Sequence, residues 1–155
     1  MEHKLIEVTE DNLKLLYDLR TNPSIDKYLT GPMPTSYDAH VKYIKDKGRS
    51  PVLRILHVEG VGNVGYGQIK HILKDRDDGK YCEVGFVIAP EHQGKGYGRA
   101  LVDAISTLAI SEPLSFNVVS LLVKETNKKA IALYKKCGYN VIMTVDNHLV
   151  MTLEF

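Results

Sequence analysis

The sequence predicts an α+β fold with three layers, in which a mixed, mostly antiparallel central sheet is flanked by helices. Three β-branched runs, over residues 51–58, 64–73 and 81–89, are separated by glycine-containing turn signals, a pattern that favours an antiparallel meander. After them come a glycine-rich turn, a helix and a further strand, as in a βαβ unit. A chain of 155 residues can bury a core of its own, so we expect one domain over residues 1–155.

The other elements follow from apolar spacing and turn residues. A strand over 4–8 precedes a helix over 10–20, whose leucines repeat at helical spacing and share a core-facing stripe with Tyr17. Residues 21–34 contain three prolines and a glycine and predict an irregular loop, which ends at the helix-starting sequence TSYD. The C-terminal elements are expected in the order helix, strand, helix, strand and strand, over residues 99–110, 118–123, 127–137, 140–145 and 148–155. In the first of these helices, helical spacing predicts a buried face of Ala100, Leu101, Ala104, Ile105 and Leu108.

Composition argues against several classes of protein. A net charge of +1 disfavours a nucleic-acid-binding protein with one large basic face. No run approaches the roughly 18 apolar residues of a membrane span, and the first residues lack the pattern of a signal peptide, so we expect a cytoplasmic protein. Cys82 and Cys137 lie far apart and the six histidines are scattered, so we expect neither a disulfide framework nor a metal site.

Three glycines stand at alternate positions in the stretch EHQGKGYGRA, residues 91–100. Because glycine loses more conformational freedom on folding than any other residue, this stretch indicates a sharp turn or the close approach of another molecule. A P-loop would need Ser or Thr where this chain has Gly96, and a dinucleotide-binding GxGxxG would need glycine where it has Arg99 or Leu101. Neither motif is present.

The spacing that remains is QxxGxG, formed by Gln93, Gly96 and Gly98 between a strand and the first turn of a helix. Positions without side chains let a phosphate oxygen approach successive backbone N–H groups, and the positive end of the helix favours the anion further. Lys95 or Arg99 would add charge to such a site. The alternative is a helix start made of turn glycines that binds nothing.

Two segments in the same order, EVGFVIAPEHQGKGYGRALVDAI at 83–105 and VKETNKKAIALYKKCGY at 123–139, resemble the GNAT family of N-acetyltransferases. The order of strands and helices fits that family along almost the whole chain. The resemblance implies the acyl-CoA N-acyltransferase fold, acetyl-CoA as the cosubstrate, and direct attack by an amine in a ternary complex.

The resemblance also implies which residues hold acetyl-CoA. The strand before the turn pairs through its backbone with the pantetheine arm, the amides of the turn bind the pyrophosphate, and an asparagine lies near the pantetheine. In this chain these residues are Phe86, Val87 and Ile88 in the strand, Gln93, Gly94, Lys95, Gly96, Tyr97, Gly98 and Arg99 in the turn, and Asn127.

Two residues match catalytic positions of the family. Glu83 resembles the glutamate that takes the amine proton directly or through water, a role that a carboxylate fills when burial raises its pKa. The alternative is that Glu83 is a solvent-facing strand residue. Tyr134 matches the tyrosine that protonates the departing thiolate, and its alternative is a place in the core.

A backbone N–H of the Val87–Ile88 region is expected to hold the oxyanion. Cys137 is interpreted as a small buried apolar residue rather than a nucleophile.

The acceptor is the part of the function that the sequence determines least. Residues 18–29 and 36–45 are similar to the ribosomal-protein N-acetyltransferase-like branch and to relatives that acetylate nucleotide-linked amino sugars. Those sugar enzymes carry Trp-Arg-Asn where this chain has LRTN, so Tyr28, Tyr37 or Tyr43 would have to replace the tryptophan. His40 is a further candidate to face the acceptor, whereas His92 is interpreted as an exposed turn residue.

Our hypothesis is a small-molecule amine acceptor such as an amino sugar, with peptide or protein N-termini as the rival. A hypothesis of another class is a non-catalytic coenzyme A-binding module, which has no chemical need to keep Glu83, Asn127 and Tyr134 together. We expect neither nucleic acid nor membrane as a partner, and a homodimer is compatible with the sequence.

Overall fold

The computed structural model describes residues 2–26, 33–45, 52–76 and 79–154. Within this part of the chain, one seven-stranded sheet runs in the order β1-β2-β3-β4-β5-β7-β6. Its strands are β1 His3–Glu7, β2 Val52–Val58, β3 Gly62–Arg76, β4 Gly79–Ile88, β5 Val118–Lys124, β6 Asn140–Val145 and β7 His148–Glu154. The predicted mixed, mostly antiparallel sheet with flanking helices is confirmed.

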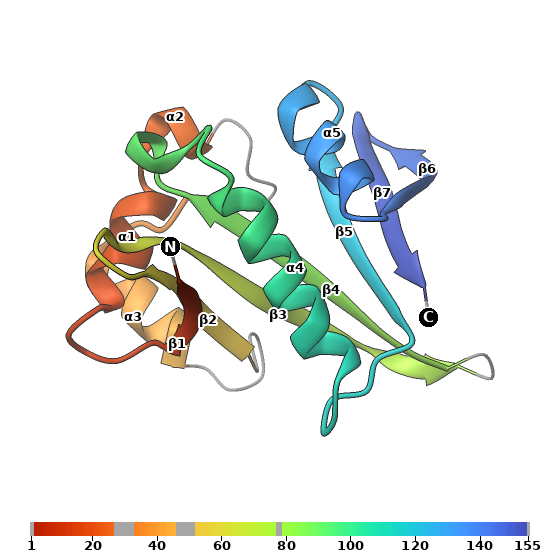
Figure 1. Ribbon diagram of the computed structural model, residues 1–155, viewed down its shortest axis with the longest axis horizontal. Helices are drawn as coiled ribbons and strands as arrows, with labels where there is room; N and C mark the ends of the chain where they lie inside the picture. Colours follow the sequence, from red (N-terminus) through yellow and green to blue (C-terminus); the bar gives the residue numbers. More distant parts are fainter. Residues whose placement is uncertain (1, 27–32, 46–51, 77–78, 155) are drawn as a thin grey trace.

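Helices cover both faces of this sheet, as Figure 1 shows. On one face, Leu101 and Ile105 share a buried cluster with Leu56 of β2, and on the other face Leu16 clusters with Ile55. Because successive strand residues point to opposite faces, the neighbours Ile55 and Leu56 place the two clusters on opposite sides. The helical elements are α1 Leu13–Arg20, α2 Pro23–Asp26, α3 Tyr37–Lys45, the short 3-10 turn η1 Pro90–His92, α4 Tyr97–Ile110 and α5 Lys128–Lys136.

The strand pairing confirms the predicted meander and the predicted βαβ unit. β1 to β4 pair antiparallel with their sequence neighbours. β4 and β5 pair parallel, and α4 is the crossover helix between them. This arrangement brings the carboxyl end of β4 and the amino end of α4 to the same end of the sheet's strands, with the glycine stretch between them (Figure 1).

The region expected to be an irregular loop, residues 21–34, differs from the prediction. It contains the short helix α2, because the Asn22 side chain accepts hydrogen bonds from the backbone N–H of Ser24 at 3.0 Å and from its hydroxyl at 2.8 Å. Residues 27–32 of this region, Tyr28 among them, lie outside the described residues. The helix after the region is confirmed, with the Ser36 hydroxyl accepting from Ala39 N–H at 3.1 Å.

The buried face of α4 is rotated from the predicted one. The sequence favours Ala100, Ala104 and Leu108 together with Leu101 and Ile105, and α4 begins two residues earlier than expected, at Tyr97. The helix α4 packs against both β3 and β4, so its buried stripe is centred between these two strands. The buried residues of α4 are Leu101, Val102, Ile105, Ser106 and Ala109.

The parallel ladder between β4 and β5 is short. It joins Tyr81 to Val118, Cys82 to Val119 and Glu83 to Ser120, and stops there. Beyond it β4 continues along β3, whereas β5 continues along β7, so the two strands diverge (Figure 1). We call the diverging segments, residues 84–88 of β4 and 121–124 of β5, the splay. No helix in the described ranges is long and apolar enough to span a bilayer.

Candidate active site

Within the described part of the chain, the edge of β4 that faces the splay carries backbone groups without a strand partner. Cys82 O, on the β5 side, accepts from the Ser120 hydroxyl at 2.9 Å, whereas Ala89 N–H donates to Val64 O on the β3 side at 2.9 Å. Because the peptide groups of a strand alternate in direction, the amides and carbonyls of Val84, Phe86 and Ile88 face the splay. The splay expected at the Val87–Ile88 region is therefore present, and it is the Ile88 amide, not that of Val87, that points into it.

The glycine turn follows directly. Gly94 and Gly96 have φ of 76° and 87°, and a Cβ on either would meet no atom within 4 Å. Left-handed backbone, rather than crowding, requires these glycines, and the space over them is open. Gly98 differs, since a Cβ there would lie 3.1 Å from Leu133 Cδ2 of α5 and the Leu133 side chain would have to shift.

Gly96 is also the N-cap of α4 and supplies no capping side chain, so the first N–H groups of a 14-residue helix point into this open space. Gln93 adds to the turn by donating from Nε2 to Ile88 O at 3.0 Å, which ties the turn to the edge of the splay. Lys95 and Arg99 are exposed beside it, and Arg99 lies 3.9 Å from Asp103. An open cradle of amides with nearby cations fits a diphosphate.

Glu83 lies at the last rung of the β4–β5 ladder, where the splay begins. Its register partners are Ser120 on β5 and His71 on β3. Its neighbours Cys82 and Val84 are buried, whereas Glu83 is only half-buried on the opposite face. That face is the one covered by α1. Val87, four residues after Glu83 and therefore on the same face of β4, packs in the cluster of Leu16.

Tyr134 reaches the splay from α5, on the other face of the sheet. Its ring lies 5.9 Å from that of Phe86 and 6.2 Å from that of Tyr139, which confirms the inward position predicted for it. Burial, together with nearby Cys137, raises the pKa of Tyr134 to about 12. The phenol is therefore protonated at neutral pH and retains a proton to donate. Glu83 and Tyr134 thus approach the same splay from opposite faces.

Asn127 caps α5. Its Oδ1 accepts from Ala130 N–H at 3.3 Å, a contact that stabilises the first turn of the helix. The side-chain amide N–H groups keep their donor capacity. A contact from them to pantetheine stays a prediction.

A cluster of aromatic rings lies between α1 and α3, near Glu83's face of the sheet. The Tyr17 ring is 5.3 Å from Tyr37 and 5.7 Å from His40, which stacks on Tyr43 at 6.4 Å. His40 is 7% exposed, and its Nδ1 has no hydrogen-bond partner among the described residues. Burial, with Arg20 nearby, lowers the pKa of His40, so the imidazole is neutral at pH 7.

Sequence reasoning named three members of this cluster as acceptor candidates but missed Tyr17, which it placed only on a core-facing stripe. No local signal identifies Tyr17, because its partners come from a helix about 20 residues away. His92 was interpreted as an exposed turn residue, but it is half-buried against Tyr97, with ring centres 6.3 Å apart.

Cys137 packs against the core as predicted but is only partly buried, because it lies where α5 ends at the surface. Burial raises its pKa to about 11, so the thiol is protonated at neutral pH and is a poor nucleophile. The described residues hold no group of three or more potential metal ligands.

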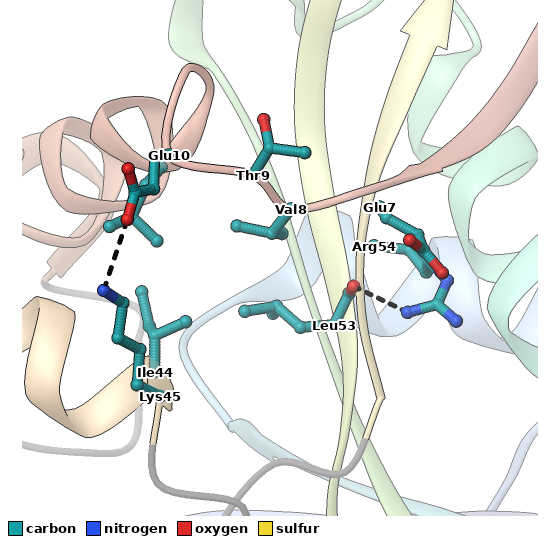
Figure 2. A pocket seen from close by; sticks show the side chains of 9 residues that line it. Glu7, Val8, Thr9, Glu10, Ile44, Lys45, Leu53 and Arg54 are labelled. Atoms are coloured by element: carbon teal, nitrogen blue, oxygen red, sulfur yellow. Dashed lines mark hydrogen bonds and ion pairs between the residues drawn. The ribbon is translucent and has the colours of Figure 1, made fainter.

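A separate hollow of about 400 Å³ lies between the β1–α1 connection, α3 and β2. Figure 2 shows the Glu10–Lys45 ion pair, 3.6 Å long, crossing it, with Arg54 donating to Leu53 O at 3.0 Å. Neither the splay nor the glycine turn lines this hollow. Both partners of the ion pair are exposed, so the hollow is a surface groove rather than the site of the predicted chemistry.

Curated relatives of this chain are acetyltransferases. The chain is 28% identical to the spermidine N(1)-acetyltransferase of Vibrio cholerae over 144 residues, which span 90% of this chain and 77% of that protein. It is also 28% identical over 135 residues to the spermine/spermidine N(1)-acetyltransferase of Bacillus subtilis, spanning 85% of this chain and 84% of that one.

Solved structures share the fold. Spermidine N-acetyltransferase from Vibrio cholerae with CoA and spermine superposes with a TM-score of 0.79 at 23% identity, covering 98% of this chain and 95% of that one. Aminoglycoside acetyltransferase AAC(6')-Ib with coenzyme A gives 0.80 at 23% identity, covering 99% and 95%.

The match to the Acetyltransferase (GNAT) family extends over residues 13–139, from α1 through the glycine turn to the end of α5. It includes every residue that the resemblance implied for the cosubstrate and for catalysis. The chain belongs to the acetyltransferase (GNAT) family and is an N-acetyltransferase that uses acetyl-CoA as its cosubstrate.

Proposed function

We propose that this enzyme acetylates the primary amine of a small molecule, with Glu83 as the base and Tyr134 as the acid. The observation that carries the proposal is the convergence of three features at the splay. These are an unpaired backbone edge on β4, an open amide cradle at Gly94 and Gly96, and two ionisable side chains on opposite faces of the sheet.

In this proposal the Phe86 and Ile88 backbone holds the pantetheine arm, and the amides from Gln93 to Arg99 hold the pyrophosphate. Acetyl-CoA supplies a thioester carbonyl for the amine to attack and a thiol as the leaving group. The Ile88 N–H, directed into the splay, stabilises negative charge on the acetyl oxygen.

The proton transfers are assigned by face. Glu83 accepts a proton from the acceptor nitrogen on the α1 face, directly or through one water, so that the nitrogen lone pair becomes free. Tyr134 donates its phenolic proton on the α5 face, where the departing thiolate needs one. Because a thiol is the stronger acid, with a pKa of about 8.5 against about 12 for the buried phenol of Tyr134, this residue assists the step without being essential.

For the acceptor, the names of the relatives suggest polyamines and aminoglycosides, both small amines. Charge on the α1 face favours an amino sugar over a polyamine. The two helices α1 and α3 carry four cationic residues, Lys14, Arg20, Lys42 and Lys45, and two carboxylates, Asp18 and Asp38. A polycation gains little attraction from such a surface, whereas the rings of Tyr17, Tyr37 and Tyr43 offer faces on which a sugar ring can stack.

The test is a panel of acceptors assayed by thiol release at equal concentrations. It contains an amino sugar, an aminoglycoside, spermidine and a peptide with a free N-terminus. Turnover of the amino sugar at a kcat/KM at least about tenfold above both spermidine and the aminoglycoside would support the proposal. Preference for spermidine or for the aminoglycoside, both polycations, would overturn the charge argument for the acceptor class, and turnover of the peptide alone would overturn the small-molecule proposal.

Two further parts of the proposal have their own tests. A non-catalytic coenzyme A-binding module would bind the cosubstrate and release no thiol with any amine of the panel.

We also place the enzyme in the cytoplasm, which is supported by the two free cysteines, Cys82 and Cys137, since a reducing compartment keeps thiols unpaired. Fractionation of cells that produce the protein checks this location.

A further inference from the structure

A β-bulge lies on β3 beside the proposed base. One rung of the β3–β4 ladder joins Ile69 to Val84. The next rung joins His71 to Glu83, so Lys70 is an extra residue between the two rungs. In an unbroken ladder Lys70 would stand opposite Glu83, where its ammonium would attract the carboxylate and make it a weaker base. A bulge re-aims a side chain, and this one moves Lys70 out of that position.

The side chain of Lys70 lies across Gly85 of β4. A Cβ on Gly85 would be 2.8 Å from Lys70 Cε and 3.5 Å from Lys70 Nζ. Gly85 is not one of the glycines with positive φ, so the space that it leaves to Lys70 explains the glycine here. Gln68, the register partner of Gly85, brings its Nε2 to 3.6 Å from the same point. Two side-chain nitrogens therefore converge over one position of β4.

This position lies on the face of β4 where the amine is proposed to react. Residues two apart on a strand point to the same face, so Gly85 shares the α1 face with Glu83. Two residues along a strand correspond to about 7 Å, which is close to the span of one sugar ring with its substituents. An acceptor whose nitrogen meets Glu83 can therefore reach the Lys70 ammonium with its far end.

The charge of Lys70 has no carboxylate partner within the described ranges. Lys70 is half-buried, yet no ion pair joins it to an acidic side chain of these residues. Partial burial takes water away from the ammonium, so an anion that replaces this water gains a charge-assisted hydrogen bond. Lys70 is thus suited to bind a carboxylate or a phosphate.

We propose that Lys70 binds an anionic group, a phosphate or a carboxylate, on the same acceptor molecule whose amine meets Glu83. This inference rests on the proposed function and narrows it, from an amino sugar to one that carries a negative charge about one ring away from its amine. Lys70 is then a residue that determines specificity. A polycation would instead bring a like charge against the ammonium and be disfavoured.

The test compares sugars that differ only in a phosphate: glucosamine, glucosamine 1-phosphate and glucosamine 6-phosphate. In the wild type, kcat/KM by thiol release should be about 10-fold to 100-fold higher for one of the phosphates than for glucosamine. Lys70→Met should remove this preference and keep glucosamine turnover, whereas Lys70→Arg should retain the preference. Lys4→Met, which removes a strand lysine from β1 at the far edge of the sheet, is the matched control and should behave as the wild type.

The source of the anion is distinguished by a further sugar, glucosaminuronic acid, which carries a carboxylate where glucosamine 6-phosphate carries its phosphate. A preference for either charged sugar that depends on Lys70 supports the inference and identifies the anion. Equal kcat/KM for charged and uncharged sugars, or a preference that Lys70→Met leaves unchanged, would overturn the inference and leave the proposed function standing. An equal loss on all sugars in Lys70→Met would also contradict it, because Lys70 would then serve Glu83 or the fold. Absence of thiol release with every sugar would overturn the proposed function and this inference together.

Gly85→Ala tests the same contact without removing the charge. The new Cβ would displace Lys70 Cε, so this variant should lose the preference for the charged sugar about as far as Lys70→Met does. Because both substitutions disrupt one contact, the double variant should lose no more than either single variant. Losses that add in the double variant would show that Gly85 and Lys70 act independently, which contradicts the proposed site.

Discussion

The two sides of the splay are built differently. On the N-terminal side, β1 to β4 pair continuously and are covered on both faces, and this side carries Glu83 and the glycine turn. On the C-terminal side, β5, β7 and β6 form a unit joined to β4 by only three rungs of ladder, and this side carries Tyr134. The site exists because pairing stops between the two units and leaves the edge of β4 available to a ligand.

This comparison assigns separate duties to the two sides. In the proposed mechanism, the glycine turn and Glu83 on the N-terminal side hold the cosubstrate and activate the amine, and Tyr134 on the C-terminal side assists the leaving group. Substitutions on the N-terminal side should therefore have the larger effects on activity.

The largest expected effect is that of Glu83→Gln. Loss of the base should lower kcat/KM by about 100-fold to 10,000-fold while acetyl-CoA affinity stays unchanged. Raising the pH should restore part of the rate of this variant, because the free amine is then supplied by solvent. Steady-state kinetics by thiol release, with calorimetry for binding, measure both quantities.

Glu7→Gln is the matched control for that variant, since Glu7 is also a strand glutamate but lies on β1. Equal activity of Glu83→Gln and the wild type would show that another residue acts as the base, and His40 would be the next candidate.

A smaller effect is expected from Gly96→Ala, which tests the cradle. An alanine at φ 87° costs about 1–2 kcal/mol of backbone strain, and its Cβ occupies the open space over the turn. We expect acetyl-CoA affinity to fall by about 10-fold to 100-fold in calorimetric titration.

Gly62→Ala is the control that separates the effect of backbone strain from the effect of a Cβ in the space over the glycine turn. Gly62 has φ 115° with nothing within 4 Å of a Cβ, and it is the first residue of β3, paired with Val58 of β2. This control should lose a similar amount of thermal stability and keep full affinity. An equal loss of affinity in both variants would show that strain, not the cradle, sets binding.

Tyr134→Phe should reduce kcat by only about tenfold, because a thiol is a good leaving group without assistance. Its neighbour Tyr139 provides the contrast, since Tyr139 OH shares a buried 2.8 Å hydrogen bond with the Ser106 hydroxyl. Tyr139→Phe should lower the melting temperature and leave kcat unchanged. If the two variants behaved in the same way, Tyr134 would be a core residue and no acid.

The smallest expected effect is a loss of stability at high pH, which comes from the buried phenols of Tyr66 and Tyr134. Burial raises the pKa of both Tyr66 and Tyr134 to about 12, above the unfolded value of 10. Below pH 10 the phenols are protonated in both states, so stability is fully present. Between pH 10 and about 12 the unfolded state loses these protons first, so the free energy of unfolding should decrease.

Urea unfolding at a series of pH values measures this decrease, and it should be smaller in Tyr134→Phe than in the wild type. The same decrease in both proteins would mean that Tyr134 is not buried in solution.

Sequence patterns with local causes predicted most of the fold and part of the site. β-branched runs, turn glycines and the helix-ending Gly138, with φ 97°, give their elements without reference to distant residues. The QxxGxG spacing marks the turn for a similar reason, because left-handed backbone at Gly94 and Gly96 needs glycine. The α2 helix and the rotation of α4 were missed, since they depend on a side-chain cap and on which strands lie beneath the helix.

What the sequence by itself determined is the order of elements, the family and the chemical identity of the groups at the turn. Only the tertiary structure decided where the β4–β5 ladder ends, which peptide groups face the splay, and that Glu83 and Tyr134 reach it from opposite faces. It also decided that the uncharged strand β6 lies at the edge of the sheet. The physical reason is that propensity and spacing act over a few residues, whereas ladder length, strand order and burial are set by contacts between segments far apart in the chain.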